Sequence, residues 1–318
     1  MRILITGVHG FVGSNLVKYL SPNNEIYGLD IVAPEKEVVV KTYSWNDLDA
    51  GRVPQVDAIV HLAGKAHDTK NQTAADVYFK VNRDLTIKVF DYFCSHAETK
   101  KFVFFSTAKA AADKVDGVLT EDVKPTPVGP YGESKIAAEE YILNVMRERS
   151  YAFEEKGVYI FRPCMIHGPG NKGNLNLLYN VVRKGIPWPL GAFENLRTFT
   201  SIENICFAVN GVLTKDVKSG IYNMGDDEAL STNELIEVIC KALGKKAHIW
   251  RIPKGFMNGV AKLGGMMHLP LTPERMCKLT ENYISSNEKI KKALEIESFP
   301  VDARTGLITT IKSFEKGR

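Results

Sequence analysis

The feature that most constrains the fold is a loop with evenly spaced glycines close to the N-terminus. In RILITGVHGFVGSNL a short apolar run leads to Gly7, Gly10 and Gly13, and an amphipathic stretch follows. Glycines permit a tight turn and a close approach of the backbone to a ligand. The N-terminus of the next helix offers free N–H groups and the positive end of the helix dipole. The pattern therefore predicts a strand, a phosphate-binding loop and a helix.

A carboxylate stands where such a loop would use one. Asp30 closes the second predicted strand, EIYGLD, 23 residues after Gly7. At this place a carboxylate accepts hydrogen bonds from an adenosine ribose and repels a 2′-phosphate. Ile31 and Val32 come next, and no arginine follows directly. The pattern predicts a dinucleotide site that prefers NAD to NADP, and the alternative is a tight strand–helix turn without a ligand.

Short β-rich runs alternate with helical stretches through the first half of the chain. The predicted strands are 2–7, 25–30, 56–64, 101–107 and 157–163, and the longest predicted helices are 76–97 and 131–149. Such alternation indicates βαβ units and a parallel sheet covered on both faces. The predicted fold class is α/β, a Rossmann-like doubly wound sheet. We assign 1–164 to dinucleotide binding and the smaller, mixed α/β region 165–318 mainly to substrate, with a chain that can cross back to the sheet.

Composition and charge narrow the class of protein further. The net charge of +4 is spread along the chain, which gives no sign of nucleic-acid binding. The five cysteines are odd in number and widely spaced, so we expect neither a disulfide framework nor a zinc site. The apolar segment GFMNGVAKLGGMMHLPL is broken by Lys262 and several glycines, and MRILITG is too short for a signal peptide. We expect a cytoplasmic protein without a metal or membrane insertion.

A tyrosine and a lysine stand four residues apart at the start of the predicted helix GPYGESKIAAEEY. Tyr131-x-x-x-Lys135 alone is a common accident, and its plain reading is two surface side chains. Other motifs accompany it in order: HLAG at 61–64, FST at 105–107, RPCMIHGPGNKGN at 162–174 and RTFTSIENI at 197–205. With the glycine spacing, the chain resembles the extended short-chain dehydrogenase/reductase superfamily over nearly its whole length. Within that superfamily it resembles the NAD-dependent epimerase/dehydratase family that acts on nucleotide sugars.

The resemblance implies a catalytic role for three residues. It makes Thr107 the hydroxyl that orients the substrate oxygen, Tyr131 the proton acceptor or donor, and Lys135 the residue that binds the nicotinamide ribose. The chemistry agrees, because oxidising a secondary alcohol removes a proton as hydride leaves. A phenol with a pKa of about 10 is a poor base at neutral pH, but a nearby ammonium and an oxidised nicotinamide both favour phenolate. The helical spacing puts both side chains on one face.

The resemblance also implies contacts to NAD and to substrate. The implied cofactor contacts are Gly7, Gly10, Phe11, Val12, Asp30, Asp47, Leu48, Leu62, Ala63, Gly64, Asn82, Tyr131 and Lys135. The implied substrate contacts are Thr107, Asn174, Arg197 and Arg275. Asp47 and Leu48 would meet the adenine, and Asn82 would tie neighbouring loops or else lie on a helix face. Asn174 and Arg197 would meet the diphosphate, since a guanidinium fork fits phosphate oxygens; the alternatives are a loop amide and a surface arginine.

Two positions bear on the reaction type. Dehydratases of the family carry an Asp-Glu pair directly after the threonine, whereas this chain has Ala108 and Lys109, so dehydration is not expected. A 4-epimerase moves hydride from C4 of the sugar to NAD and returns it to the other face of the keto sugar. A 4-ketoreductase only reduces a keto sugar that another enzyme has made. Both reactions use the same three residues.

We therefore predict an NAD-dependent UDP-hexose or UDP-N-acetylhexosamine 4-epimerase of surface-polysaccharide sugar metabolism. The alternative is an NAD(P)H-dependent 4-ketoreductase of a UDP-4-keto-6-deoxy-N-acetylhexosamine. A non-catalytic dinucleotide sensor is the alternative of another class. The resemblance also implies a homodimer, formed through a bundle that includes the helix of Tyr131 and Lys135.

Overall fold

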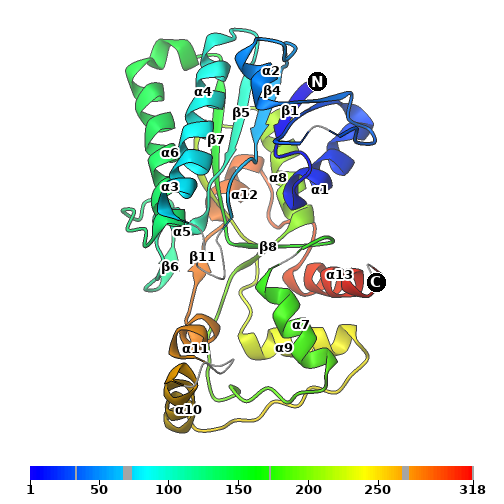
Figure 1. The fold of residues 1–318 in the computed structure, drawn as a ribbon, viewed down its shortest axis with the longest axis vertical. Coiled ribbons are helices and arrows are strands. Elements are labelled where there is room, and N and C mark those ends of the chain that lie inside the picture. Colours follow the sequence, from blue (N-terminus) through cyan, green and yellow to red (C-terminus); the bar gives the residue numbers. More distant parts are fainter. Residues whose placement is uncertain (33, 67–73, 172, 267–271, 317–318) are drawn as a thin grey trace.

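The computed structural model describes the whole chain apart from residues 33, 67–73, 172, 267–271 and 317–318. A seven-stranded sheet forms the upper part of the molecule in Figure 1, and neighbouring strands run parallel. In spatial order the strands are β10 (Gly220–Met224), β7 (Gly157–Pro163), β5 (Lys101–Phe105), β4 (Ala58–His61), β1 (Arg2–Thr6), β2 (Glu25–Leu29) and β3 (Lys41–Tyr43).

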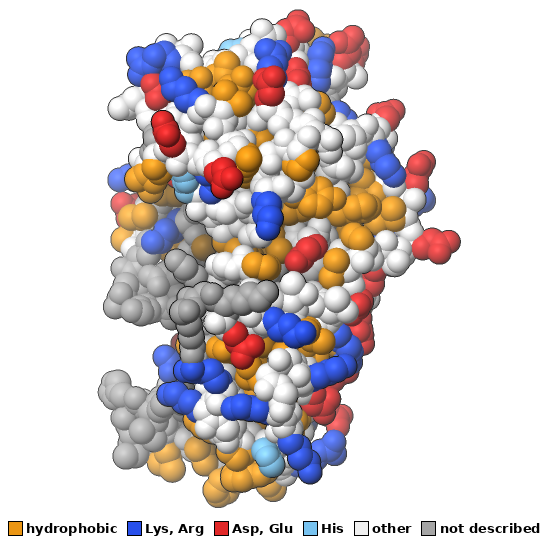
Figure 2. All heavy atoms as spheres, turned by 90° about the vertical axis from the view of Figure 1, so that its right-hand side faces the viewer, with side chains coloured by type: hydrophobic (Ala, Val, Ile, Leu, Met, Phe, Trp, Pro, Cys, Tyr) orange, Lys and Arg blue, Asp and Glu red, His pale blue; other side chains and the backbone are white. Residues whose placement is uncertain are grey.

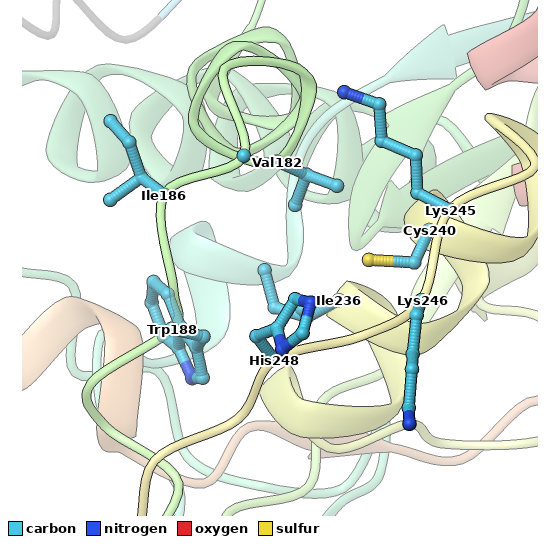
Figure 3. Close-up of a pocket in the computed structure, with 9 residues that line it drawn as sticks. Val182, Ile186, Trp188, Ile236, Cys240, Lys245, Lys246 and His248 are labelled. Atoms are coloured by element: carbon cyan, nitrogen blue, oxygen red, sulfur yellow. The ribbon is translucent and has the colours of Figure 1, made fainter.

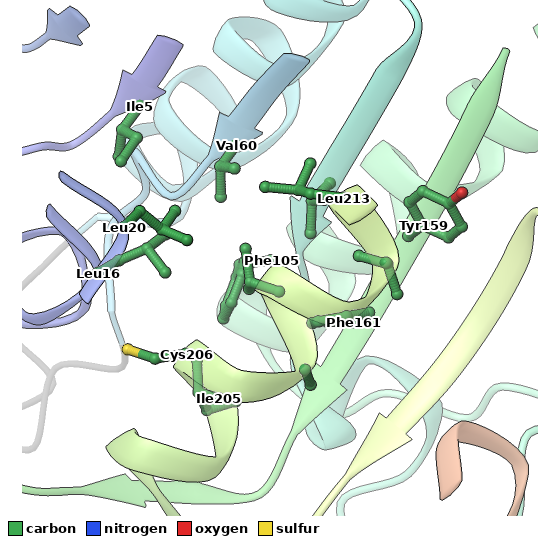
Figure 4. Close-up of a cluster of buried hydrophobic side chains, with 14 of the residues drawn as sticks. Ile5, Leu16, Leu20, Val60, Phe105, Tyr159, Phe161, Ile205, Cys206 and Leu213 are labelled. Carbon is green, nitrogen blue, oxygen red and sulfur yellow. The ribbon is translucent and has the colours of Figure 1, made fainter. Parts of the chain in front are cut away.

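Side chains alternate between the two faces of this sheet, and each face has its own core. In β1, Ile3 and Ile5 join one apolar cluster, whereas Leu4 joins another. The first face carries α1 (Phe11–Leu20), α8 (Ile202–Thr214) and α12 (Glu288–Leu294), and the second carries α4 (Leu85–Ser95) and α6 (Pro130–Glu148). Figure 4 shows side chains from the strands and from α1 and α8 meeting in the first cluster. The predicted doubly wound α/β fold is confirmed, and burial on both faces explains the continuous apolar runs.

The smaller part of the molecule lies below the sheet in Figure 1. Two short strand pairs belong to the connection between the parts: β8 (Met165–His167) with β9 (Phe199–Ser201), and β6 (Val118–Leu119) with β11 (Ile284–Ser285). The helices of this part are α7 (Asn174–Arg183), α9 (Thr232–Ala242), α10 (Lys254–Met266), α11 (Pro273–Thr280) and α13 (Ala303–Lys316). A third apolar cluster, which includes side chains of α7, α9 and α13, forms the core of this part. Ser231 caps α9 in a capping box with Glu234.

The chain after residue 164 returns to the sheet. It supplies the edge strand β10, which pairs with β7, and the helices α8 and α12 that cover the first face. The two parts are therefore joined by several crossings of the chain. The assignment of 165–318 to substrate binding stays a prediction.

The helix expected over 76–97 is built from three pieces. α3 (Ala75–Tyr78) leads into a π-helical segment, Phe79–Asp84, and α4 then ends at Ser95. π-Helical turns occur mostly as single insertions, frequently at functional sites. Here the segment contains the predicted loop-tying residue Asn82.

The remaining short elements are α2 (Trp45–Asp49), α5 (Ala108–Ala111) and the 3₁₀ turns Ser21–Asn23 and Ser150–Phe153. The strand expected over 56–64 is shorter, since β4 covers only Ala58–His61. It ends there because the N–H groups of Leu62 and Ala63 donate to the Thr6 hydroxyl, at 3.1 and 3.0 Å.

Candidate active site

The glycine-spaced loop forms the turn that the sequence predicts. Gly7 has a φ of +67°, and the Gly10 N–H donates to the Gly7 carbonyl at 2.9 Å. A Cβ on Gly13 would lie 2.3 Å from that carbonyl oxygen, so only glycine lets α1 begin this close to the turn. Gly10 caps α1 and has no side chain with which to occupy the first-turn N–H groups of Phe11 and Val12. The helix start therefore fits the pyrophosphate of a dinucleotide.

Asp30 supports this loop from the end of β2. Its Oδ2 accepts from the His9 N–H at 3.0 Å and its Oδ1 from the Ile31 N–H at 2.8 Å. A carboxylate oxygen has a second lone pair, so Asp30 can also accept from a ribose hydroxyl. The same side chain thus shapes the loop and fits the adenosine half of NAD.

Lys36 is a cation near Asp30 that sequence reasoning missed. Its Nζ donates to the Ser14 hydroxyl in the first turn of α1 at 2.8 Å. Burial lowers the pKa of Lys36, and the charge of Asp30 raises it. Six residues separate Lys36 from Asp30, and only the packing of this segment against α1 brings the two charges together.

Asp47, which is predicted with Leu48 to contact adenine, forms hydrogen bonds at the start of its own helix, α2. Asp47 Oδ2 accepts from the Ser44 N–H and hydroxyl at 2.8 and 2.7 Å, which closes the capping box of α2, and Oδ1 accepts from Arg52 Nε at 2.6 Å. The bonds to Ser44, and then the one to Arg52, hold the Asp47 pKa well below its usual range. Leu48 is buried in the core of the second face. The contact of Asp47 and Leu48 with adenine stays a prediction.

The turn after β4 comes close to α6. A Cβ on Gly64 would lie 3.0 Å from Asn82 Oδ1 and 3.1 Å from Lys135 Nζ, so a larger residue would crowd both groups. Leu62 and Ala63 precede it, held by Thr6. The structure thus brings the predicted dinucleotide contacts 62–64 to the ammonium that would bind the nicotinamide ribose.

Asn82 ties this turn to α6. Its side chain is fully buried; Oδ1 accepts from the Lys65 N–H at 2.8 Å, and Nδ2 donates to the Ser134 hydroxyl at 3.0 Å. A buried amide with all these bonds holds two segments in register. The side chain thus ties neighbouring segments, as the resemblance implies, although it belongs to a helical segment; its role in NAD binding stays a prediction.

Thr107, Tyr131 and Lys135 come together at the carboxyl end of β5. Thr107 follows β5 and caps α5, while the other two residues occupy the first turns of α6. Lys135 Nζ donates to the Phe105 carbonyl at 2.7 Å, close to Thr107 in the chain. The side chains of Thr107 and Tyr131 are hydrogen-bonded to one another. The spacing along the sequence therefore corresponds to a contiguous group in space.

Burial sets the protonation of this group. It lowers the pKa of Lys135 to about 8, opposed by the negative charge of Glu139. It raises the pKa of Tyr131; the bond to Thr107 lowers that pKa, and Tyr78, whose ring centroid lies 6.2 Å away, raises it. The phenol of the chain by itself is therefore a weaker acid than free tyrosine, contrary to what the nearby ammonium alone predicts.

The Lys135 pKa leads to a testable pH dependence. We expect the affinity for NAD to fall as the pH rises through about 8, because the ammonium that would hold the ribose hydroxyls loses its proton there. Calorimetric titration of NAD from about pH 6.5 to about 9.5 measures this. Lys135→Arg keeps its positive charge over this range, so its affinity for NAD should not fall at high pH. Equal affinity of the unmodified protein at both ends would contradict the role of Lys135.

Two buried charges behind Lys135 were missed in the sequence. Arg162 in β7 is 1% exposed and Glu139 in α6 is 0% exposed. Arg162 Nη2 lies 2.5 Å from Glu139 Oε2, and Arg162 Nε lies 3.1 Å from each carboxylate oxygen. The Ser106 hydroxyl also donates to Glu139. The pair ties α6, one turn beyond Lys135, to the ends of β5 and β7.

Residues from the second half of the chain contact the segment that follows Thr107. The Tyr283 hydroxyl donates to the Ala112 carbonyl at the end of α5, at 2.8 Å. Burial raises the pKa of Tyr283 and also that of Cys164, the latter to about 12, and the positive charge of Arg197 lowers both. The Arg197 side chain therefore lies near Tyr283 and Cys164. Its guanidinium also donates to the Lys278 carbonyl of α11.

Asn174 and Arg275 are the other predicted substrate contacts in this half of the chain. Asn174 begins α7, and its side chain lies outside the described residues. Arg275 is exposed on α11, where its N–H donates to the Thr272 hydroxyl at 3.3 Å. The contacts of Asn174, Arg197 and Arg275 with a diphosphate stay predictions. Tyr283 could not be found in the sequence, because no local pattern marks it.

A separate pocket of about 280 Å³ lies between α7 and α9. Figure 3 shows Trp188 and Ile236 at its apolar side and Lys245 and Lys246 on the loop after α9. Among the described residues that line it, none belongs to the catalytic group. This pocket is therefore distinct from the candidate active site.

The described residues offer neither a metal site nor a membrane span. In that part of the chain no three His, Cys, Asp or Glu side chains are grouped as a metal site would need. None of the helices there has the length and apolar character needed to cross a membrane. All five cysteines are free thiols.

Comparison with known proteins gives consistent matches. The model of the NAD dependent epimerase/dehydratase family matches residues 3–225. The chain is 29% identical over 270 residues to the UDP-glucose 4-epimerase of Vibrio cholerae, covering 79% of this chain and 78% of that protein. It is 27% identical over 299 residues to the N-acetyl-alpha-D-glucosaminyl-diphospho-ditrans,octacis-undecaprenol 4-epimerase of Escherichia coli O157:H7, covering 92% and 85%. The structure of the UDP-glucose 4-epimerase of Thermus thermophilus with NAD superposes with a TM-score of 0.75 at 22% identity, covering 100% of both chains.

Proposed function

Because the chain belongs to the NAD-dependent epimerase/dehydratase family of extended short-chain dehydrogenases/reductases, we propose that it is a 4-epimerase of a UDP-hexose or UDP-N-acetylhexosamine. It is an enzyme of this family, and NAD is its cofactor. The proposed setting is cytoplasmic synthesis of a surface polysaccharide, by a homodimer. The similarity to the UDP-glucose 4-epimerase of Vibrio cholerae supports the choice of reaction.

The observation that carries this proposal is the environment of Thr107. The next residue, Ala108, is 2% exposed and has no group that can transfer a proton. Lys109 is held by Asp113, with 2.8 Å between Nζ and Oδ1. These two positions therefore offer no acid–base pair for eliminating water, and the catalytic group is suited to proton transfer at a single alcohol.

The residues of the chain have separable tasks in the proposed reaction. Thr107 and Tyr131 hold the C4 hydroxyl, and Tyr131 takes its proton and later gives it back. Lys135 binds ribose hydroxyls and adds positive charge beside the phenol. Bound NAD supplies a reversible hydride acceptor and further positive charge. Since burial raises the Tyr131 pKa, proton transfer depends on that added charge.

A sugar carried on a polyprenyl diphosphate is a second candidate substrate. The supporting observation is the match, over 92% of this chain, to the 4-epimerase of Escherichia coli O157:H7 whose name includes a diphospho-undecaprenol carrier. The proposed diphosphate contact of Arg197 would serve either carrier, since both present a diphosphate next to the sugar.

Product analysis with a panel of substrates tests the proposal. The protein with NAD is incubated with UDP-hexoses, UDP-N-acetylhexosamines, a UDP-4-keto-6-deoxy sugar and a polyprenyl diphosphate sugar. We expect inversion at C4, seen by NMR, without net formation or loss of NADH. Consumption of one equivalent of NADH by the keto sugar alone would identify the 4-ketoreductase instead. A 4-keto-6-deoxy product from a hexose would contradict the inference that Ala108 and Lys109 leave no acid–base pair for dehydration.

The proposed homodimer is tested separately, by sedimentation velocity on the same sample.

A further inference from the structure

The second half of the chain contains a segment in which all charged side chains are Lys or Arg. Residues 238–265 include neither Asp nor Glu, although acidic and basic residues are nearly balanced in the chain as a whole, at 37 and 41. The basic residues of this segment are Lys241, Lys245, Lys246, Arg251, Lys254 and Lys262. In Figure 1 the segment runs from α9 to α10 at the lower end of the molecule. Figure 2 shows Lys and Arg side chains and hydrophobic side chains together at that end.

The helix α10 has two large apolar side chains that are exposed. Its inner side packs into the third apolar cluster through Met257 and Ala261, which are 4% and 0% exposed. Phe256 and Leu263 are 66% and 54% exposed. They stand seven residues apart, so they share one face of the helix, away from the buried side. α10 therefore has a second apolar face that no described part of the chain covers.

The neighbouring residues complete this surface. Trp250, just before α10, is 56% exposed. Its backbone is fixed, because its N–H donates to the Trp188 carbonyl at 2.8 Å. Arg251, Lys254 and Lys262 are exposed, and the Lys254 ammonium lies 5.7 Å from the centre of the Phe193 ring. We call the set Trp250, Arg251, Lys254, Phe256, Lys262 and Leu263 the α10 surface.

We propose that the α10 surface docks on an anionic lipid bilayer. Helices that lie in a membrane interface combine Trp, Phe and Leu on one side with Lys and Arg on the other. Each basic residue near an anionic membrane surface adds attraction, and the indole of Trp suits the boundary between head groups and acyl chains. The absence of carboxylates in 238–265 removes the repulsion that anionic head groups would otherwise meet. The attachment is peripheral: α10 is a 13-residue helix, too short to span a bilayer.

Docking would place the substrate side of the enzyme at the membrane. α10 packs against α11, and α11 receives the Arg197 guanidinium on its Lys278 carbonyl. The α10 surface and the predicted diphosphate residue are thus linked through one helix. The docking itself does not depend on the proposed function, since it is measured without substrate.

Vesicle co-sedimentation of the full chain tests the proposal. We expect binding to phosphatidylglycerol/phosphatidylcholine vesicles, weakening as salt is added, and little binding to phosphatidylcholine alone. Removal of one lysine, as in Lys254→Gln or Lys262→Gln, should weaken binding about fivefold. Phe256→Ser should weaken it about tenfold, through the loss of buried apolar area.

A matched control distinguishes the α10 surface from exposed aromatics in general. Tyr151 is 75% exposed near the end of α6, and Tyr151→Ser should bind vesicles as the unmodified protein does. All four variants should keep the far-UV circular dichroism and NAD affinity of the parent. Absence of binding to anionic vesicles, or equal binding by Phe256→Ser, would overturn the proposal. Retention by RNA or an acidic protein without vesicle binding would overturn it as well.

Discussion

Replacing Tyr131 by phenylalanine is expected to lower kcat about 100- to 10,000-fold, the usual contribution of a positioned proton-transfer group. The phenol is hydrogen-bonded to Thr107, and α6 places it one turn from Lys135. Phenylalanine keeps the ring and its edge contact with Tyr78, so packing is preserved while the transferable proton is removed. The measurement is the initial rate with the best substrate of the panel, under saturating NAD.

Tyr141→Phe is the matched control for this prediction. Tyr141 lies on the same helix, and its hydroxyl donates to Asp91 at 2.6 Å, away from the catalytic group. We expect this variant to keep the parental kcat. If Tyr131→Phe retained it too, Tyr131 could not be the proton-transfer residue, and another group would have to take the proton. NAD affinity should be unchanged in Tyr141→Phe.

Removal of the Glu139 carboxylate is expected to destabilise the fold by about 3–5 kcal/mol, because it leaves the buried Arg162 guanidinium without its counterion. Both side chains are almost completely buried, and three contacts of 2.5 to 3.1 Å join them. Glu139→Ala also removes the acceptor of the Ser106 hydroxyl. Urea unfolding of the apo protein, followed by circular dichroism, measures the change in free energy.

A second variant separates the lost pair from the lost volume. In Glu139→Met/Arg162→Met neither buried charge remains, and replacing a buried ion pair by hydrophobic residues of similar volume is often neutral relative to the intact pair. We therefore expect the double variant to be clearly more stable than Glu139→Ala. If the double variant were as unstable as the single one, the stabilisation would reside in packing and not in the charge pair. Glu139→Gln alone should also lower the pKa of Lys135 further, since Glu139 raises it.

Local signals account for the part of the structure that the sequence predicted. The turn of Gly7, Gly10 and Gly13 depends on backbone conformation and on close approach, and both are set by neighbouring residues. The strand–helix alternation likewise follows from apolar periodicity. The fold class, the glycine turn and the grouping of Tyr131 with Lys135 were therefore within reach of sequence reasoning.

Long-range packing accounts for what sequence reasoning missed. Arg162 and Glu139 are 23 residues apart, and an apolar strand pattern gives no sign that one of its members is a buried cation. Tyr283 meets Ala112 across 171 residues. The raised pKa of Tyr131 is also a property of burial, which spacing does not report. Such features arise from the meeting of separate elements.

The return of the chain to the sheet limits how this enzyme can change its substrate. β10, α8 and α12 complete the sheet and its first apolar face, yet they belong to the half that carries Arg197 and Tyr283. Cutting the chain near residue 164 would expose that face, so the two halves cannot be exchanged between relatives as independent modules. New substrate preferences would instead have to accumulate as point substitutions within an intact scaffold.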